Sequence, residues 1–242
     1  MTPTGGVPGH VAVVVPARNE EDHIGACLVS VGAAVRRLRR ERPTITGDVI
    51  VVLDRCTDAT ERIAAELGAV IVRSDAGRVG TARRLGVQHA RHRACRAGIA
   101  DRDVWLANTD ADTEVPDTWL SSQVDFAAAG VDMTVGTVTP VDLDETHERH
   151  WRAVHMLAEG HSHVHGANLG LRLSAYLAAG GFADVAVHED LDVVSRVRAL
   201  TDRWVATHQT SVTTSGRMQS RVDGGFASFI AGLDAEDTTC AS

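Results

Sequence analysis

Two aspartates, Asp110 and Asp112, are the residues of this sequence best placed to bind a metal ion. They follow an apolar run at residues 103–108 that predicts a buried strand. In an extended chain, side chains two residues apart point the same way, so both carboxylates would face one spot beyond the sheet. A hard divalent cation, Mn²⁺ or Mg²⁺, would relieve their repulsion and neutralise a diphosphate leaving group. Two solvated aspartates in a polar loop would give the same pattern, so the pair alone decides nothing.

Strands and helices are predicted to alternate over the first half of the chain. Continuous apolar runs predict strands at residues 10–16, 48–53, 69–72 and 103–108. Helices are predicted between them, one capped by Asn19 and another by Thr81. This order is typical of an α/β fold in which helices flank a mostly parallel sheet. The polar residues of interest follow the carboxyl ends of the strands, where open α/β sheets bind ligands.

The second half of the chain is less regular and predicts a mixed arrangement. Strands are expected at residues 131–138 and 167–171, a short helix after Ser174, and a longer helix at residues 189–200. Residues 140–165 are polar and rich in histidine. With no internal repeat and no clear linker, residues 1–242 are interpreted as one domain.

The composition excludes several classes of protein. An apolar content of 44% supports a sizeable core, and the net charge of −8 makes nucleic acid a poor partner. All 24 basic residues are arginine, so Schiff-base and Walker-type lysine chemistry is excluded. No transmembrane segment or signal peptide is expected, and the cysteines form no C-x-x-C pair, which favours a cytoplasmic protein. The oligomeric state stays open.

Six ordered segments spread from residue 13 to residue 190 resemble those of family 2 glycosyltransferases. They are VVVPARNEE (13–21), VVLDRCTDAT (51–60), GTARRLG (80–86), DAD (110–112), GANLG with GGF (166–170 and 180–182) and HED (188–190). In the third segment, Arg84 stands where the family usually has asparagine. The resemblance implies a GT-A fold, with residues 10–115 as the half that binds a nucleotide-sugar donor and residues 116–242 as the acceptor half. The acceptor would be a small molecule, a lipid carrier or a glycan.

The resemblance also implies roles for individual residues of the donor half. The nucleotide pocket would be lined by Pro16, Ala17, Arg18 and Glu20. Asp54 would accept hydrogen bonds from the base, for which uracil is the favoured choice. Arg83 would approach the base or the diphosphate, although a solvated helix arginine would look the same. In the segment Asp110-Ala111-Asp112, Asp110 would hold the ribose or a metal-bound water and Asp112 would bind the metal directly.

The resemblance places the catalytic base in the acidic segment before the last predicted helix. Asp190 would take the proton of an acceptor hydroxyl while the sugar carbon is attacked opposite the leaving diphosphate, with inversion. Glu189 is the alternative base, because the sequence does not separate adjacent carboxylates. Acidic residues in a first helical turn also suit the helix dipole without any catalytic role.

Two further residues are candidates with weaker support. His208 would complete the metal site, as a C-terminal histidine does in many GT-A enzymes. Arg217, in the polar segment 213–217, would close over the diphosphate, although an ordinary surface loop is equally compatible. The histidines of the acceptor half are interpreted as acceptor-loop or exposed residues rather than as a metal site: His161, His163, His165 and His188.

Two other functions are weighed against the transferase. A nucleotidyltransferase would also use carboxylates and a metal, but its glycine- and lysine-rich phosphate loop is missing. A non-catalytic nucleotide-sugar-binding domain is the second alternative, and the presence of both acidic segments argues against it. A dinucleotide-binding oxidoreductase is excluded because no G-x-G-x-x-G follows the first strand.

Overall fold

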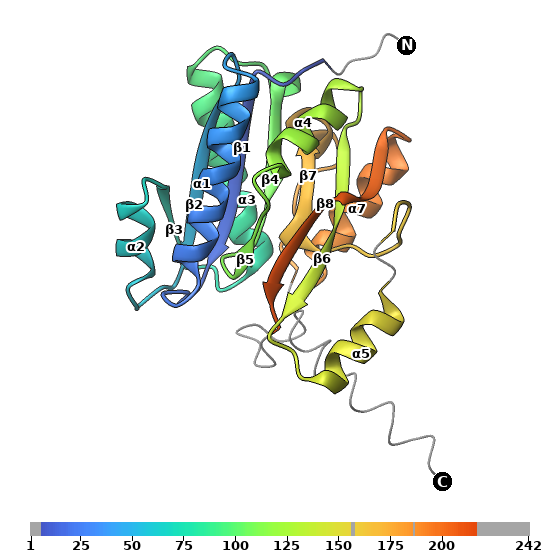
Figure 1. The fold of residues 1–242 in the computed structure, drawn as a ribbon. Helices are drawn as coiled ribbons and strands as arrows, with labels where there is room; N and C mark the ends of the chain where they lie inside the picture. Colours follow the sequence, from blue (N-terminus) through green and yellow to red (C-terminus); the bar gives the residue numbers. More distant parts are fainter. Residues whose placement is uncertain (1–5, 156–157, 186, 217–242) are drawn as a thin grey trace.

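The computed structural model describes residues 6–155, 158–185 and 187–216, and a single mixed sheet runs through them (Figure 1). The eight strands found in these ranges are β1 (His10–Ala17), β2 (Thr46–Asp54), β3 (Val70–Ser74), β4 (Val104–Asn108), β5 (Thr113–Glu114), β6 (Met133–Val141), β7 (Leu169–Arg172) and β8 (Trp204–Ser215).

The strand order divides the sheet into a parallel part and a mixed part. The order is β3-β2-β1-β4-β7-β6-β8-β5, and the first four strands are parallel. β7 runs antiparallel to β4 and β6, β6 is parallel to β8, and β5 closes the edge antiparallel to β8. The predicted fold class is confirmed: a mostly parallel N-terminal part continues into a mixed C-terminal part. The division into donor and acceptor halves stays a prediction.

Helices cover both faces of the sheet. The helices are α1 (Ile24–Glu41), α2 (Thr60–Glu66), α3 (Val79–Arg96), α4 (Trp119–Ala128), α5 (Glu145–Val154), α6 (Leu173–Ala178) and α7 (Glu189–Leu200), with short 3₁₀ turns η1 (Asp101–Asp103) and η2 (Gly166–Asn168). One core holds α1 and α4 against the sheet, and a second core holds α3, α6 and α7 against the other face. α5 lies beyond the end of the sheet, apart from the other helices (Figure 1).

Strand β1 shows why the parallel strands are apolar over most of their length. Val11, Val13 and Val15 pack into the core with α1, whereas Ala12 and Val14 pack into the core with α3. A strand covered on both faces cannot alternate apolar and polar residues, so its sequence is a continuous apolar run. This pattern is what identified the four parallel strands in the sequence.

Two predicted helix caps are wrong. Asn19 does not begin α1, which starts at Ile24; Asn19 has a left-handed backbone (φ 53°), and its side-chain oxygen accepts the Thr57 N–H at 2.8 Å. Thr81 lies inside α3, which starts at Val79, and its hydroxyl donates to Asp184 at 2.8 Å. In both cases a tertiary partner takes the side chain that local sequence would assign to the cap.

The structure also corrects the reading of the C-terminal part. Residues 145–154, expected only as polar chain, form α5, which begins where the Asp144 carboxylate accepts the Thr146 and His147 N–H groups. Residues 213–215, expected in a loop over the diphosphate, are the end of β8 and pair with β5 and β6. Arg217 lies outside the described residues. Each helix in the described ranges is too short or too polar to span a bilayer.

Candidate functional site

The candidate site lies at the carboxyl edge of the parallel strands. β1 ends at Ala17, β2 at Asp54 and β4 at Asn108, so the predicted donor residues that follow them share this edge. α7, which carries the second acidic pair, begins at the same edge, because Glu189 contacts Arg83 and Arg83 contacts Asp110. The fold therefore gathers residues that are up to about 170 positions apart in sequence, from Ala17 to Glu189.

The loops after β1 and β2 are joined by hydrogen bonds. The Glu20 N–H donates to the Thr60 hydroxyl at 2.8 Å, and the Cys56 thiol donates to the Ala17 carbonyl at 3.3 Å. Ala17 and Glu20 are buried, while Pro16 and Arg18 are half-buried. These contacts fix the backbone at residues 16–20, where the sequence predicts the wall of the nucleotide pocket.

Asp54 is buried and held at the end of β2. One carboxylate oxygen accepts the Ser74 hydroxyl at 2.9 Å and the Gly77 N–H at 3.0 Å. Among the described residues both hydrogen bonds go to Oδ1, so Oδ2 remains to accept a hydrogen bond from a base. Ser74 and Gly77 escaped the sequence analysis; the turn residues Ser-Asp-Ala-Gly at the end of the third apolar run were the available signal.

Asp110 and Asp112 lie in a turn and not in an extended chain, which corrects the geometric argument made from their spacing. The Thr113 N–H donates to the Asp110 carbonyl at 3.2 Å, closing the turn before β5. The Asp110 carboxylate accepts from Arg83, and the Asp112 carboxylate accepts the Thr214 hydroxyl at 3.4 Å. Both aspartates are half-buried, whereas the side chain of Ala111 packs in the core with α1. The turn therefore presents two carboxylates, each already oriented by a partner.

Arg83 is buried beneath the site rather than solvated. Its guanidinium donates to Asp110 and to Glu189, and it lies 6.0 Å from the centre of the Phe182 ring. Burial opposes its charge, but Asp110, Glu189 and Asp190 together raise the pKa of Arg83 above its ordinary value. The sequence placed Arg83 near the donor; the structure shows it bridging two carboxylates from different segments.

The two acidic residues that begin α7 have different surroundings. Glu189 is buried, and burial raises the pKa of its carboxyl; Asp190 adds to the rise, and Arg83 opposes it. Asp190 is half-buried, and its carboxylate accepts the Gly166 N–H at 2.7 Å and the Leu191 N–H at 2.8 Å. Gly166 belongs to the GANLG segment, which predicted no role for it; in the structure its N–H orients the Asp190 carboxylate.

His208 is not brought to the acidic turn. It lies exposed in the middle of β8 and pairs with Glu159 at 2.8 Å, whereas the β8 residues next to Asp112 are Thr214 and Ser215. Six residues of strand separate His208 from Thr214, which is roughly 20 Å at the usual rise. The proposed metal role of His208 is thus set aside on geometry. Across the described residues, no three His, Cys, Asp or Glu side chains gather as a metal-binding group.

Most histidines of the segment 155–165 lie together. His155 stacks on Trp151, His163 and His165 stack on His155, and His161 lies beside His163 with its Nε2 3.2 Å from the Val135 carbonyl oxygen. His188 lies elsewhere, in a left-handed conformation (φ 62°) at the N-cap of α7. The four histidines near Trp151, without His188, form an aromatic stack that was not predicted from the sequence.

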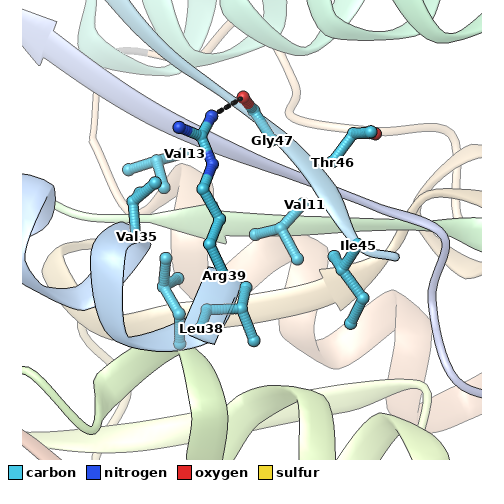
Figure 2. Close-up of a pocket in the computed structure, with 9 residues that line it drawn as sticks. Val11, Val13, Val35, Leu38, Arg39, Ile45, Thr46 and Gly47 are labelled. Carbon is cyan, nitrogen blue, oxygen red and sulfur yellow. Dashed lines mark hydrogen bonds between the residues drawn. The ribbon is translucent and has the colours of Figure 1, made fainter. Parts of the chain in front are cut away.

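A small hollow at the opposite end of the sheet is not a ligand site. Figure 2 shows it beneath Arg39, whose guanidinium approaches the Gly47 carbonyl at 3.5 Å. The hollow holds about 10 Å³, room for at most one water molecule. It lies at the amino ends of β1 and β2 and is lined chiefly by apolar side chains: Val11, Val13, Val35, Leu38, Ile45 and Leu120.

The comparisons with known proteins agree with this fold and its residue order. Residues 12–176 match the family model described as glycosyl transferase family 2, so the chain belongs to that family. No curated protein sequence matches the chain.

Several solved structures are similar to this chain throughout its sheet. S. aureus TarS 1–349 is 14% identical with a TM-score of 0.60, over 86% of this chain and 61% of that chain. The mannosyltransferase PcManGT from Pyrobaculum calidifontis is 19% identical with a TM-score of 0.58, over 98% and 66%. Glucosyl-3-phosphoglycerate synthase from Mycobacterium tuberculosis is 14% identical with a TM-score of 0.56, over 95% and 79%. The likeness shows a GT-A fold, and the chain spans less than two thirds of the TarS and PcManGT chains.

Proposed function

We propose that this chain transfers a sugar from a nucleoside diphosphate sugar to an acceptor hydroxyl, with the help of a divalent metal and with inversion at the sugar carbon. The observation that carries the proposal is the Arg83 contact with both Asp110 and Glu189. It places the acidic turn, where a donor diphosphate would bind, beside the residue that precedes the candidate base Asp190. A donor site and a base within reach of one another are what group transfer requires.

The donor end of the site would be read by Asp54 and the β1 loop. A carboxylate whose Oδ1 is held by Ser74 and Gly77 would offer Oδ2 to the N–H of a uracil or guanine ring. Pro16, Ala17, Arg18 and Glu20 would line the pocket beside it. Related structures contain UDP or GDP-mannose, and we favour UDP as the donor nucleotide.

The donor set at the acidic turn fits a hard divalent cation. Asp110 and Asp112 supply carboxylate oxygens, which Mg²⁺ and Mn²⁺ prefer, and such ions take their remaining ligands from water and substrate phosphates. Two protein carboxylates therefore suffice without His208. Mn²⁺ is present in the PcManGT complex and in the M. tuberculosis synthase complex. When bound, the cation would neutralise the charge that develops on the leaving diphosphate.

Asp190 is the better of the two candidate bases. Glu189 is buried and engaged by Arg83, so its carboxylate is shielded from an acceptor. Asp190 is half-buried, and two N–H groups fix its orientation. In the proposed step, Asp190 removes the acceptor hydroxyl proton, the acceptor oxygen bonds to the sugar carbon, and the bond to the diphosphate oxygen breaks on the opposite side.

Calorimetry with nucleotides and Mn²⁺ tests the donor site directly. UDP, GDP and dTDP would be titrated into the wild type and Asp112→Ala, with and without the metal. We expect metal-dependent binding of one nucleotide, weakened at least about tenfold in Asp112→Ala, since a lost contact to a charged group costs about 1.5–3 kcal/mol.

Asp117→Ala is the matched control, because this exposed aspartate forms an ion pair with Arg37 alone among the residues that the structure describes. It should bind nucleotide as the wild type does. Absence of binding by any of the three nucleotides with Mn²⁺ present would overturn the proposed function. Binding without slow hydrolysis of the matching nucleotide sugar would favour the non-catalytic alternative.

A further inference from the structure

Arg83 joins three segments that the proposed reaction needs in register. It extends from α3, donates to Asp110 in the acidic turn, and donates to Glu189 at the first position of α7. We call these three residues the Arg83 bridge. Its partners lie 27 and 106 residues away in sequence, so the bridge is set entirely by tertiary structure.

The backbone passes close to the bridge at two glycines. A Cβ placed on Gly166 would lie 2.5 Å from Nη1 of Arg83, and a Cβ on Gly80 would lie 2.9 Å from the Glu189 side chain. Both positions are therefore glycine where the guanidinium and the glutamate pass close to backbone. The same Gly166 donates its N–H to Asp190, so one backbone segment covers the bridge and orients the candidate base.

The guanidinium is not available to a donor. Its two terminal nitrogens contact Asp110 and Glu189, its side chain is 3% exposed, and its buried Nε finds no hydrogen-bond partner within the described part of the chain. A diphosphate would have to displace Asp110 to reach it. Its position instead favours an action through the two carboxylates that it holds.

We infer that Arg83 is a positioning residue for the transfer: through Asp110 and Glu189 it holds the acidic turn and the start of α7 at a fixed separation. Asp190, the next residue of α7, is thereby fixed relative to the donor. This inference rests on the proposed function. Lysine would keep the charge but not the bridge, because a single ammonium cannot present a planar fork to two carboxylates.

The bridge is tested with Arg83→Lys, Glu189→Gln and the double variant. Hydrolysis of the UDP- or GDP-sugar whose nucleotide binds would be followed with Mn²⁺ present, together with calorimetry of the nucleotide. We expect nucleotide affinity and KM within about threefold of the wild type, because Asp110 and Glu189 hold the guanidinium and a donor would not contact it. The kcat should fall about a hundredfold in each single variant, the size expected of a displaced catalytic group.

The double variant shows whether Arg83 and Glu189 act together or independently. If Arg83 acts through Glu189, the double variant should lose little more than the worse single variant. Amide hydrogen exchange at residues 187–192 should be faster in Arg83→Lys. Arg93→Lys, at the exposed far end of the same helix, should leave kcat and exchange unchanged.

Each outcome bears on a different claim. If nucleotide affinity falls by the same factor as kcat, Arg83 is a donor-binding residue and the inference is wrong. A wild-type kcat in a folded Arg83→Lys variant would also overturn the positioning inference. If the lysine variant does not fold, a wild-type kcat in Glu189→Gln would overturn it in the same way. If the wild type neither binds nor hydrolyses any donor, the proposed function fails and the positioning role fails with it.

Discussion

Acidification should destabilise the chain through two histidines, the buried His155 and the half-buried His165. The His155 ring stacks on Trp151 with centroids 3.3 Å apart and on His163 with centroids 4.3 Å apart, and His165 lies 5.8 Å from His155. Burial lowers the pKa of His165 to about 3, with further lowering by His155, His163 and His161. Burial, followed by the charge of His163, lowers the pKa of His155 to about 4.

The sign of the pH effect on the free energy of unfolding follows from the protonation state that the folded chain excludes. Both pKa values are depressed from 6.5, so the folded chain holds these rings neutral while the unfolded chain protonates them. Their contribution is fully present above pH 6.5 and is lost as the pH falls towards 4 and 3. Each pH unit below the unfolded value costs about 1.4 kcal/mol per group, so the two histidines lose about 3 kcal/mol by about pH 5.5.

Urea unfolding at about pH 7.5 and about pH 5.5 measures this loss as a change in the free energy of unfolding. The matched variant carries His155→Phe and His165→Phe, which keep flat rings but cannot titrate. Burial also lowers the pKa values of His10 and His89, so the variant retains some pH dependence from these residues. The wild type should lose about 3 kcal/mol more than the variant. Equal losses in the two proteins would refute the reasoning.

Two further substitutions test the donor pocket and the core. Asp54→Asn should weaken nucleotide binding about tenfold in calorimetry, because an amide N–H₂ would face the base N–H, while the Ser74 and Gly77 bonds and the unfolding midpoint persist; unchanged affinity would remove Asp54 from the pocket. Gly86→Ala should destabilise the chain by about 1–2 kcal/mol in urea unfolding: its Cβ would lie 2.5 Å from Val14, and overpacking costs more than the roughly 1 kcal/mol gained in helix propensity. A more stable variant would contradict this packing.

The parallel strands were predictable because strands buried on both faces appear in the sequence as continuous apolar runs. β1 and β2 are covered on both faces, which requires apolar residues at every position. Asp54 and Asp110 could be placed at one sheet edge because the parallel strands before them end at the same edge. The six ordered segments, rather than these apolar runs, carried the resemblance to family 2 glycosyltransferases, and the family match over residues 12–176 confirms it.

The contacts inside the site were not predictable from local sequence. The turn at Asp110–Asp112 depends on the short β5 that follows it, and β5 exists because it pairs with β8, about one hundred residues later. The spacing of the two aspartates alone indicated extended chain. Likewise, nothing near Arg83 in the sequence distinguishes a buried bridge from a solvated helix residue; Gly166 and Gly80, which make room for it, come from other segments.

The predictions for the C-terminal part were wrong for a related reason, because they also depended on distant partner strands. β8 is rich in threonine, and Thr207, Thr210 and Thr214 are buried although their type suggests an exposed polar loop when the partner strands are unknown. The loop expected at residues 213–215 and the metal role expected of His208 both followed from missing this strand. Once β8 is recognised, its register fixes Thr214 beside Asp112 and leaves His208 facing Glu159.

The balance of charge at the site explains why the proposed donor would depend on a metal. Arg83 lies among the carboxylates of Asp110, Glu189 and Asp190, and Asp112 shares the turn with Asp110. One buried cation cannot offset four carboxylates, so a diphosphate entering this edge meets like charge in a poorly screened setting. Arg83 cannot be released to meet it without leaving Glu189 buried and unpaired. A divalent cation at the acidic turn resolves both constraints, because it supplies positive charge to the diphosphate while the Arg83 bridge stays intact.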